Sequence, residues 1–106
     1  MKGLKLFNRK EFFECHEVIE ELWLETPSED KYRDLYKGVI QAAAAIYQWE
    51  RGILSGARGL HKTAVKYLKK YEPAALGLNV EKLVRELNGF FKDFNETLLP
   101  VLEYHS

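Results

Sequence analysis

The feature that most constrains the fold is the helical periodicity of residues 12–23, which read Phe-Phe-Glu-Cys-His-Glu-Val-Ile-Glu-Glu-Leu-Trp. With 100° between successive residues, the apolar side chains share one wide arc of a helix. His16 and Glu20, one turn apart, fall inside this apolar sector. An unpartnered polar group among buried carbons costs roughly 1–3 kcal/mol. We therefore expect the pair to lie buried beneath aromatic rings and to have a partner, which can be a side chain, a water or a metal.

The chain has 106 residues, with 16 basic side chains, 16 acidic side chains and one cysteine. This length predicts a single domain, residues 1–106, that buries enough surface to fold without disulfides. The single cysteine and the lack of a leader-like start favour the cytoplasm. The longest uncharged run, residues 38–49, is too short to span a membrane, so no membrane association is predicted.

The apolar patterns predict an all-α fold, a compact antiparallel bundle of four main helices. Their expected bounds are about residues 8–25, 29–51, 56–71 and 80–98. Asn8, Ser28, Ser55 and Asn79 are expected to cap their first turns. The second helix is apolar nearly all the way round, which is typical of a helix packed on several sides, and we expect it to be the central rod. No β-strand is predicted.

The leading interpretation of the polar pair is structural. Gln41, on the second helix, is the expected partner of His16 or Glu20, with the first helix facing Gly38 and Gln41. Gly38 is small enough to let a neighbouring helix approach closely. A hydrogen-bonded cluster of this kind would fix the register of the two helices.

The alternative interpretation is a metal-dependent or acid/base enzyme centred on His16 and Glu20, with Gln41 as a further catalytic candidate. Two ligands one turn apart can share an ion, and a single divalent metal held by His16, Glu20 and His61 is the specific hypothesis. Glu17 completes a His-Glu-x-x-Glu string. This string is not the metalloprotease signature, which requires a second histidine where Glu20 stands. We expect a protein that is not an enzyme, and no other cofactor is predicted.

A basic row marks the outer face of the third predicted helix. Its members are Arg58, Lys62, Lys66 and Lys69. An RNA-associated module using this face is a second alternative, although a solvated face is the commoner meaning of such a row and zero net charge disfavours nucleic acid. The six Tyr, six Phe and two Trp exceed what the helical stripes need. Some are expected to form an exposed patch that contacts a protein partner or a second copy of the chain.

Three segments together carry a resemblance: residues 12–23, 36–44 and 52–57. The order His-Glu-x-x-Glu-x-x-Trp, then Gly-x-x-Gln-x-Ala, resembles the small prokaryotic domain-of-unknown-function family numbered three hundred and nine. The marked positions are His16, Glu17, Glu20, Trp23, Gly38 and Gln41. The resemblance covers about residues 7–71. It implies a compact all-α bundle without an established activity, so no catalytic residue carries over from it. We therefore expect an uncharacterised helical-bundle protein that acts through protein contacts.

Overall fold

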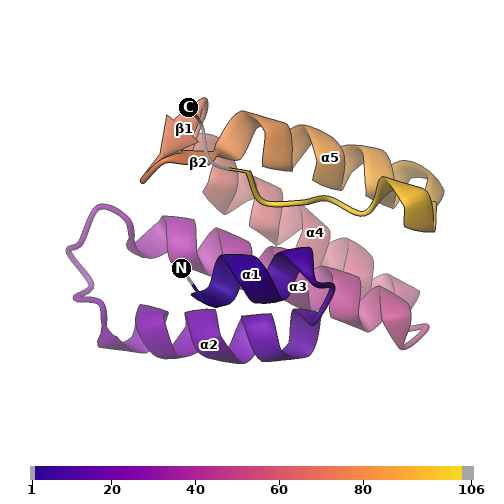
Figure 1. Cartoon of the computed structure of the whole chain (residues 1–106), viewed down its shortest axis with the longest axis horizontal. Helices are drawn as coiled ribbons and strands as arrows, with labels where there is room; N and C mark the ends of the chain where they lie inside the picture. The colour runs from indigo at the N-terminus through magenta and orange to yellow at the C-terminus, as the bar shows by residue number, and fades with distance from the viewer. Residues whose placement is uncertain (1, 104–106) are drawn as a thin grey trace.

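A computed structural model describes residues 2–103 and confirms the predicted all-α helical bundle (Figure 1). Its elements in chain order are α1 (Lys2–Asn8), α2 (Phe12–Glu25), α3 (Arg33–Glu50), α4 (Leu54–Leu68), η1 (Lys69–Tyr71), β1 (Ala74–Ala75), β2 (Leu78–Asn79), α5 (Val80–Asp93) and η2 (Glu96–Leu98). The four main helices are α2, α3, α4 and α5. No helix in the described part of the chain is both long and apolar enough to cross a membrane.

The main helices run alternately up and down, with α3 between α2 and α4 and with α5 over α4 (Figure 1). α1 lies along α2, and the segment after α5 returns over the bundle toward the N-terminus. Asn8 fixes this return because its amide nitrogen donates to the Leu102 carbonyl at 2.9 Å and its amide oxygen accepts from the Leu102 backbone N–H at 2.7 Å. The segment near the C-terminus is thereby held against the last residue of α1.

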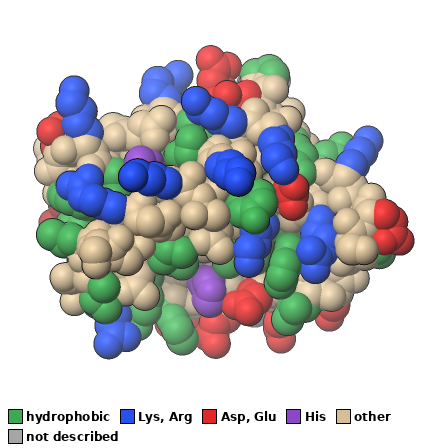
Figure 2. Space-filling view, turned by 180° about the vertical axis from the view of Figure 1, so that it is seen from behind, with side chains coloured by type: hydrophobic (Ala, Val, Ile, Leu, Met, Phe, Trp, Pro, Cys, Tyr) green, Lys and Arg blue, Asp and Glu red, His purple; other side chains and the backbone are tan. Residues whose placement is uncertain are grey.

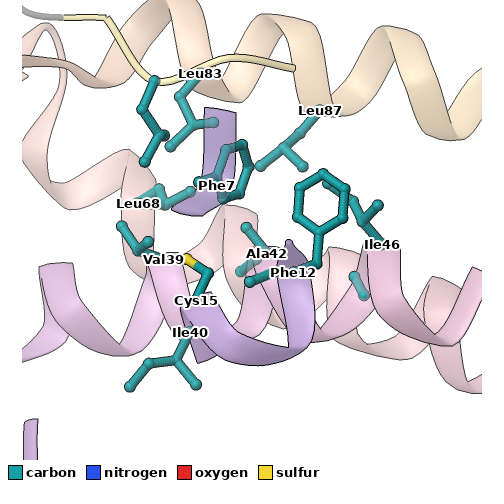
Figure 3. Packing of buried hydrophobic residues seen from close by; sticks show 14 of the residues in the cluster. Phe7, Phe12, Cys15, Val39, Ile40, Ala42, Ile46, Leu68, Leu83 and Leu87 are labelled. Atoms are coloured by element: carbon teal, nitrogen blue, oxygen red, sulfur yellow. The ribbon is translucent and has the colours of Figure 1, made fainter. Parts of the chain in front are cut away.

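α3 is the central rod of the core, as its apolar pattern predicts. Eight of its 18 residues are buried: Leu35, Gly38, Val39, Ile40, Ala42, Ala43, Ala45 and Ile46. Side chains from α1, α2, α4 and α5 converge on the same space (Figure 3). The rings of Phe7 and Phe12 meet there edge to face, with their centroids 5.1 Å apart. Because Phe7 is fully buried, α1 belongs to the core.

α3 and α4 approach closely at Gly38. A Cβ atom added at this position would lie 2.8 Å from Cγ and Cδ2 of Leu68 and 3.3 Å from the Leu68 backbone nitrogen. Leu68 is itself fully buried at the end of α4, so it has little room to move. The expected close approach of a neighbouring helix at Gly38 is thus present, and that neighbour is α4.

The prediction that the first helix covers residues 8–25 is wrong at its start. The chain forms two helices here, α1 and α2, and α2 begins at Phe12. Lys10 adopts the left-handed conformation, with φ at 66°, and separates α1 from α2. Asn8, the expected cap, ends α1 and uses its side chain on Leu102. This reversal lets α1 fold back along α2.

The other predicted helices are displaced by a few residues at their ends. α3 begins at Arg33 because residues 27–32 form turns, in which the Ser28 hydroxyl donates to Glu29 and the Asp30 carboxylate accepts from the Tyr32 N–H. α4 begins at Leu54, ahead of the expected cap Ser55. A short hairpin, β1 paired with β2, precedes α5 and was not predicted.

α5 begins as predicted, because Asn79 accepts from the Lys82 backbone N–H at 3.0 Å. It ends earlier than predicted, at Asp93, because the next residue, Phe94, adopts the left-handed conformation with φ at 50°. Asn95 then caps η2 by accepting from the Thr97 backbone N–H. The apolar stripe of this region is therefore divided between a helix and a separate 3₁₀ turn.

Replacing Gly38 with alanine is expected to destabilise the protein. The added methyl group would gain roughly 1 kcal/mol of helix propensity, but it would force Leu68 out of its packed position at a cost of about 1–3 kcal/mol. Gly59→Ala, on the exposed side of α4 with open space around it, is the matched control and should raise the free energy of unfolding. Urea unfolding of both variants measures the difference. Equal stabilisation by the two substitutions would contradict the close packing described.

Candidate functional site on the surface of α2

The His16–Glu20 pair lies at the surface. His16 Nε2 is 3.3 Å from Glu20 Oε2, and 31% of the histidine side chain and 44% of the glutamate side chain are exposed. The prediction that both groups are buried is therefore wrong. The buried residues of α2 are Phe12, Cys15 and Ile19, and Trp23 packs partly buried against the same core. The arc of α2 that its neighbours cover is therefore narrower than its apolar arc, and the His16–Glu20 pair lies at the edge of the covered arc.

A small hollow between α2 and α3 lies beside His16. It has a volume of about 190 Å³ and is lined by Phe13, His16, Ala44, Tyr47 and Gln48. The rings of Phe13 and Tyr47 are 5.2 Å apart and tilted by 43°. The Gln48 amide oxygen is buried without a hydrogen-bond partner in residues 2–103. The His16 imidazole thus lies beside the Phe13 ring of its own helix and beside the Tyr47 ring and the Gln48 amide of α3.

Gln41 and Gly38 do not occupy the places expected of them. Gln41 is half-buried, and its side chain makes no hydrogen bond within residues 2–103, so it does not hold His16 or Glu20. Gly38 faces Leu68 of α4. The cluster of His16, Glu20 and Gln41 that the sequence predicted is therefore not assembled by hydrogen bonds.

Trp23 anchors the other end of α2 to α3. The guanidinium carbon of Arg33 lies 4.2 Å from the indole centroid and the ammonium nitrogen of Lys37 lies 4.4 Å from it. Arg33 also donates from Nε to the Thr26 carbonyl at 3.2 Å. Two cations on one ring stabilise this corner by cation–π attraction. The motif tryptophan therefore makes a structural contact between α2 and α3.

His61 lies at a different helix interface. Its Nε2 is 2.8 Å from the Asn88 side-chain oxygen, and its ring stacks on Phe91 with centroids 4.5 Å apart. These contacts join α4 to α5, whereas His16 faces α3. In the described part of the chain, no three His, Cys, Asp or Glu side chains gather as a set that could hold a metal. The proposed ligand set of His16, Glu20 and His61 is thus not brought together.

The outward side of α2 carries a row that the sequence analysis did not identify. Phe13, Glu17, Glu20 and Leu24 follow one another at helical spacing, and we call these four residues the α2 stripe. The Phe13 ring at one end is 43% exposed and Leu24 at the other is 65% exposed. Two carboxylates lie between two apolar side chains. The signal was available, because residues 11–30 contain eight acidic residues and no Lys or Arg.

The acidic character continues at the end of the molecule where α2 begins. Burial raises the pKa of the Glu50 carboxyl above its ordinary value, and the nearby carboxylates of Glu14 and Glu96 raise it further. These three groups repel one another when ionised. Three carboxyl groups are thus close enough at this end of the molecule to affect one another.

The predicted basic row is exposed, as expected. Arg58, Lys62, Lys66 and Lys69 all face outward from α4 and η1. Arg58 is held in place because its guanidinium carbon lies 4.6 Å from the Phe94 ring centroid. In the space-filling view from behind, lysine and arginine side chains spread over the molecule and many acidic side chains lie along its lower edge (Figure 2).

Replacing His16 with glutamine, or Glu20 with glutamine, is expected to change the free energy of unfolding by less than about 0.5 kcal/mol, since a half-exposed pair one turn apart contributes little. Ile19→Ala on the same helix is the control and should cost about 2–5 kcal/mol. Chemical denaturation measures all three. A loss above about 1.5 kcal/mol for His16→Gln would restore the structural interpretation of the pair.

Cys15 is a core residue. Its thiol donates to the Gly3 carbonyl, with sulfur and oxygen 3.3 Å apart, and burial raises its pKa from 9.0 to about 12. Between these values the thiol is ionised only in the unfolded chain, so its contribution to stability is complete below pH 9 and falls as the pH rises toward 12, by about 1.4 kcal/mol per pH unit.

Cys15→Ala should therefore flatten the alkaline loss of stability relative to the unmodified protein. Urea titrations at pH 8.5, 9.5 and 10.5 measure the two slopes. Parallel slopes would show that the thiol ionises equally in the folded and unfolded states.

Comparison with known proteins places the chain in a family. The chain is 29% identical over 100 residues to "Uncharacterized protein YpuF" of Bacillus subtilis (strain 168), an alignment that covers 87% of this chain and 57% of the relative. The chain thus spans little more than half the length of that curated relative. The model of the family described as "Domain of unknown function (DUF309)" matches residues 1–60, which include α1, α2, α3 and the start of α4. The chain belongs to this family of unknown function.

Proposed function

We propose that the protein is a non-catalytic interaction domain of the cytoplasm that binds a basic, partly apolar segment of a partner protein on the α2 stripe. The observation that carries this proposal is the stripe itself. Phe13 and Leu24, both large and exposed, stand at its two ends, and the carboxylates of Glu17 and Glu20 lie between them. Exposed apolar anchors flanked by charge are typical of surfaces that bind another protein.

The charge of α2 determines which partner the stripe fits. The helix carries five glutamates and no Lys or Arg, and they are Glu14, Glu17, Glu20, Glu21 and Glu25. Like charges three or four residues apart destabilise a helix by about 0.2–0.5 kcal/mol per pair. A basic partner would relieve this repulsion, whereas an acidic partner would increase it. The proposal therefore commits to lysine or arginine side chains interspersed with apolar ones.

A photo-crosslinking residue in place of Leu24 tests this proposal in cells of the source organism. We expect discrete covalent adducts from position 24. The same residue in place of Leu98, which is also an exposed leucine but lies in η2, is the matched control and should yield none of them. Sequencing of the crosslinked peptide should show a segment rich in Lys or Arg.

Charge reversal separates binding from folding. Glu17→Lys with Glu20→Lys, which reverses the two carboxylates of the stripe, should abolish the adducts from position 24 while the unfolding midpoint stays equal or rises, because the substitutions remove like-charge repulsion. Adducts that survive the reversal, or that form equally at positions 24 and 98, would overturn the proposal.

A further inference from the structure

A second charged surface lies on the other side of α3 and has the opposite sign. Between Glu50 and Glu72 the chain contains no acidic residue and six basic ones: Arg51, Arg58, Lys62, Lys66, Lys69 and Lys70. All six are exposed. α4 lies toward the back in Figure 1, so Figure 2 views the molecule from the side of α4, and many lysine and arginine side chains are visible there. We call Arg58, Lys62, Lys66 and Lys70 the α4 row.

The spacing of the α4 row concentrates its charge. Its four members follow one another at intervals of four residues, which is about 6 Å along the helix and about 18 Å from first to last. Like charges at this spacing repel one another. Among the described residues, the only member with a carboxylate within 4 Å is Lys70, whose ammonium lies 2.7 Å from Asp34. The rest of the row therefore keeps its positive field.

The α4 row differs from the α2 stripe because it lacks apolar anchors. The inward side of α4 is used by the core, through Ala57, Ala64 and Leu68. The large exposed hydrophobic residue of α4 is Leu54, at the first position of the helix and outside the row. A membrane-surface helix buries an apolar face, and protein interfaces are depleted in lysine. A row of cations without anchors fits a ligand whose own charges are regularly repeated.

We propose that the α4 row binds the phosphodiester backbone of a nucleic acid. Phosphate contacts by Lys and Arg need no apolar anchor and give binding that is independent of base sequence. Tyr67 adds a ring to the same surface, half-buried and with the Lys70 ammonium 5.5 Å from its centroid. An aromatic ring beside a cation, as at the Lys70 end of the row, provides a face on which a base of a single strand can stack. Zero net charge does not oppose this binding, since the acidic groups of α2 lie on a different face.

Fluorescence anisotropy with labelled 20-nucleotide probes tests the proposal on the full chain. The probes are single-stranded RNA, double-stranded RNA and double-stranded DNA, which all have a phosphodiester backbone. Their relative affinities show which type of nucleic acid the protein prefers. If the three cations without a carboxylate partner, Arg58, Lys62 and Lys66, each neutralise one phosphate of a single strand, the affinity should fall roughly 20-fold between 50 and 200 mM salt. No binding at 50 mM salt, or an affinity that does not change with salt, would overturn the proposal.

Charge reversal at two sites localises the interaction. Lys62→Glu with Lys66→Glu should weaken binding at least about 10-fold. Lys5→Glu with Arg9→Glu makes the same change in net charge at the same spacing, on exposed residues of α1 and its C-terminal end, and should weaken binding less than about 2-fold. Circular dichroism of both variants should match the unmodified protein. If the two double substitutions weakened binding equally, the binding would depend on net charge alone, and the assignment to the α4 row would be wrong.

A competitor separates nucleic acid from an acidic protein. Poly-glutamate of matched charge should leave the labelled nucleic acid bound, because it lacks the phosphate spacing and the bases. If poly-glutamate displaced the labelled probe at the same concentration of charge as unlabelled nucleic acid does, the row would bind acidic polypeptides equally well, and the proposal would be wrong.

Discussion

The close approach of α3 and α4 is the constraint on which the rest of the bundle depends. It exists because Gly38 leaves the space that Leu68 fills, with no Cβ atom between the two helices. Eight of the 18 residues of α3 are then buried, and the other helices are positioned by the side of α3 that they cover. α1 and α5 close the remaining side through Phe7 and the phenylalanines of α5, while the Asn8–Leu102 hydrogen bonds hold the returning segment in place. The absence of a side chain at Gly38 thereby determines how the large core side chains around α3 are arranged.

The same packing decides where the charges lie. α2 turns Phe12, Cys15 and Ile19 inward, and its charged side chains outside are acidic. α4 turns Ala57, Ala64 and Leu68 inward, and its charged side chains outside are basic. Because α3 lies between them, the two sets are kept apart. The molecule measures 34 × 27 × 23 Å, and charges at physiological salt are screened over about 8 Å. A partner at one face therefore senses that face alone, and the zero net charge of the chain says little about either.

The four main helices could be predicted because a period of 3.6 residues is a local property of the sequence. The Asn79 cap could also be predicted, since it acts within three residues. The exposure of His16 could not, because a helical wheel gives angles and does not say how wide an arc the neighbours cover. His61 likewise faces α5, and nothing local distinguishes that neighbour from α2. The break at Lys10 depends on α1 packing back through Phe7, and the clamp on Leu102 joins residues 94 positions apart.

The exposure of the His16–Glu20 pair bears on the choice between contact and catalysis. Catalytic groups act most strongly where a site excludes water and fixes their dipoles in a low dielectric. Here the imidazole and the carboxylate stand on the convex side of a helix, each about a third to a half exposed. The hollow beside His16 holds about 190 Å³, below the roughly 300–1,000 Å³ of ordinary small-molecule pockets. A larger hollow of about 440 Å³ lies beside Glu20, but its lining residues all belong to α2, so no second element encloses it. A surface of this shape becomes dry only when a macromolecule covers it. The pair is therefore better suited to hydrogen-bond across an interface, where the partner itself would supply the exclusion of water that the fold does not.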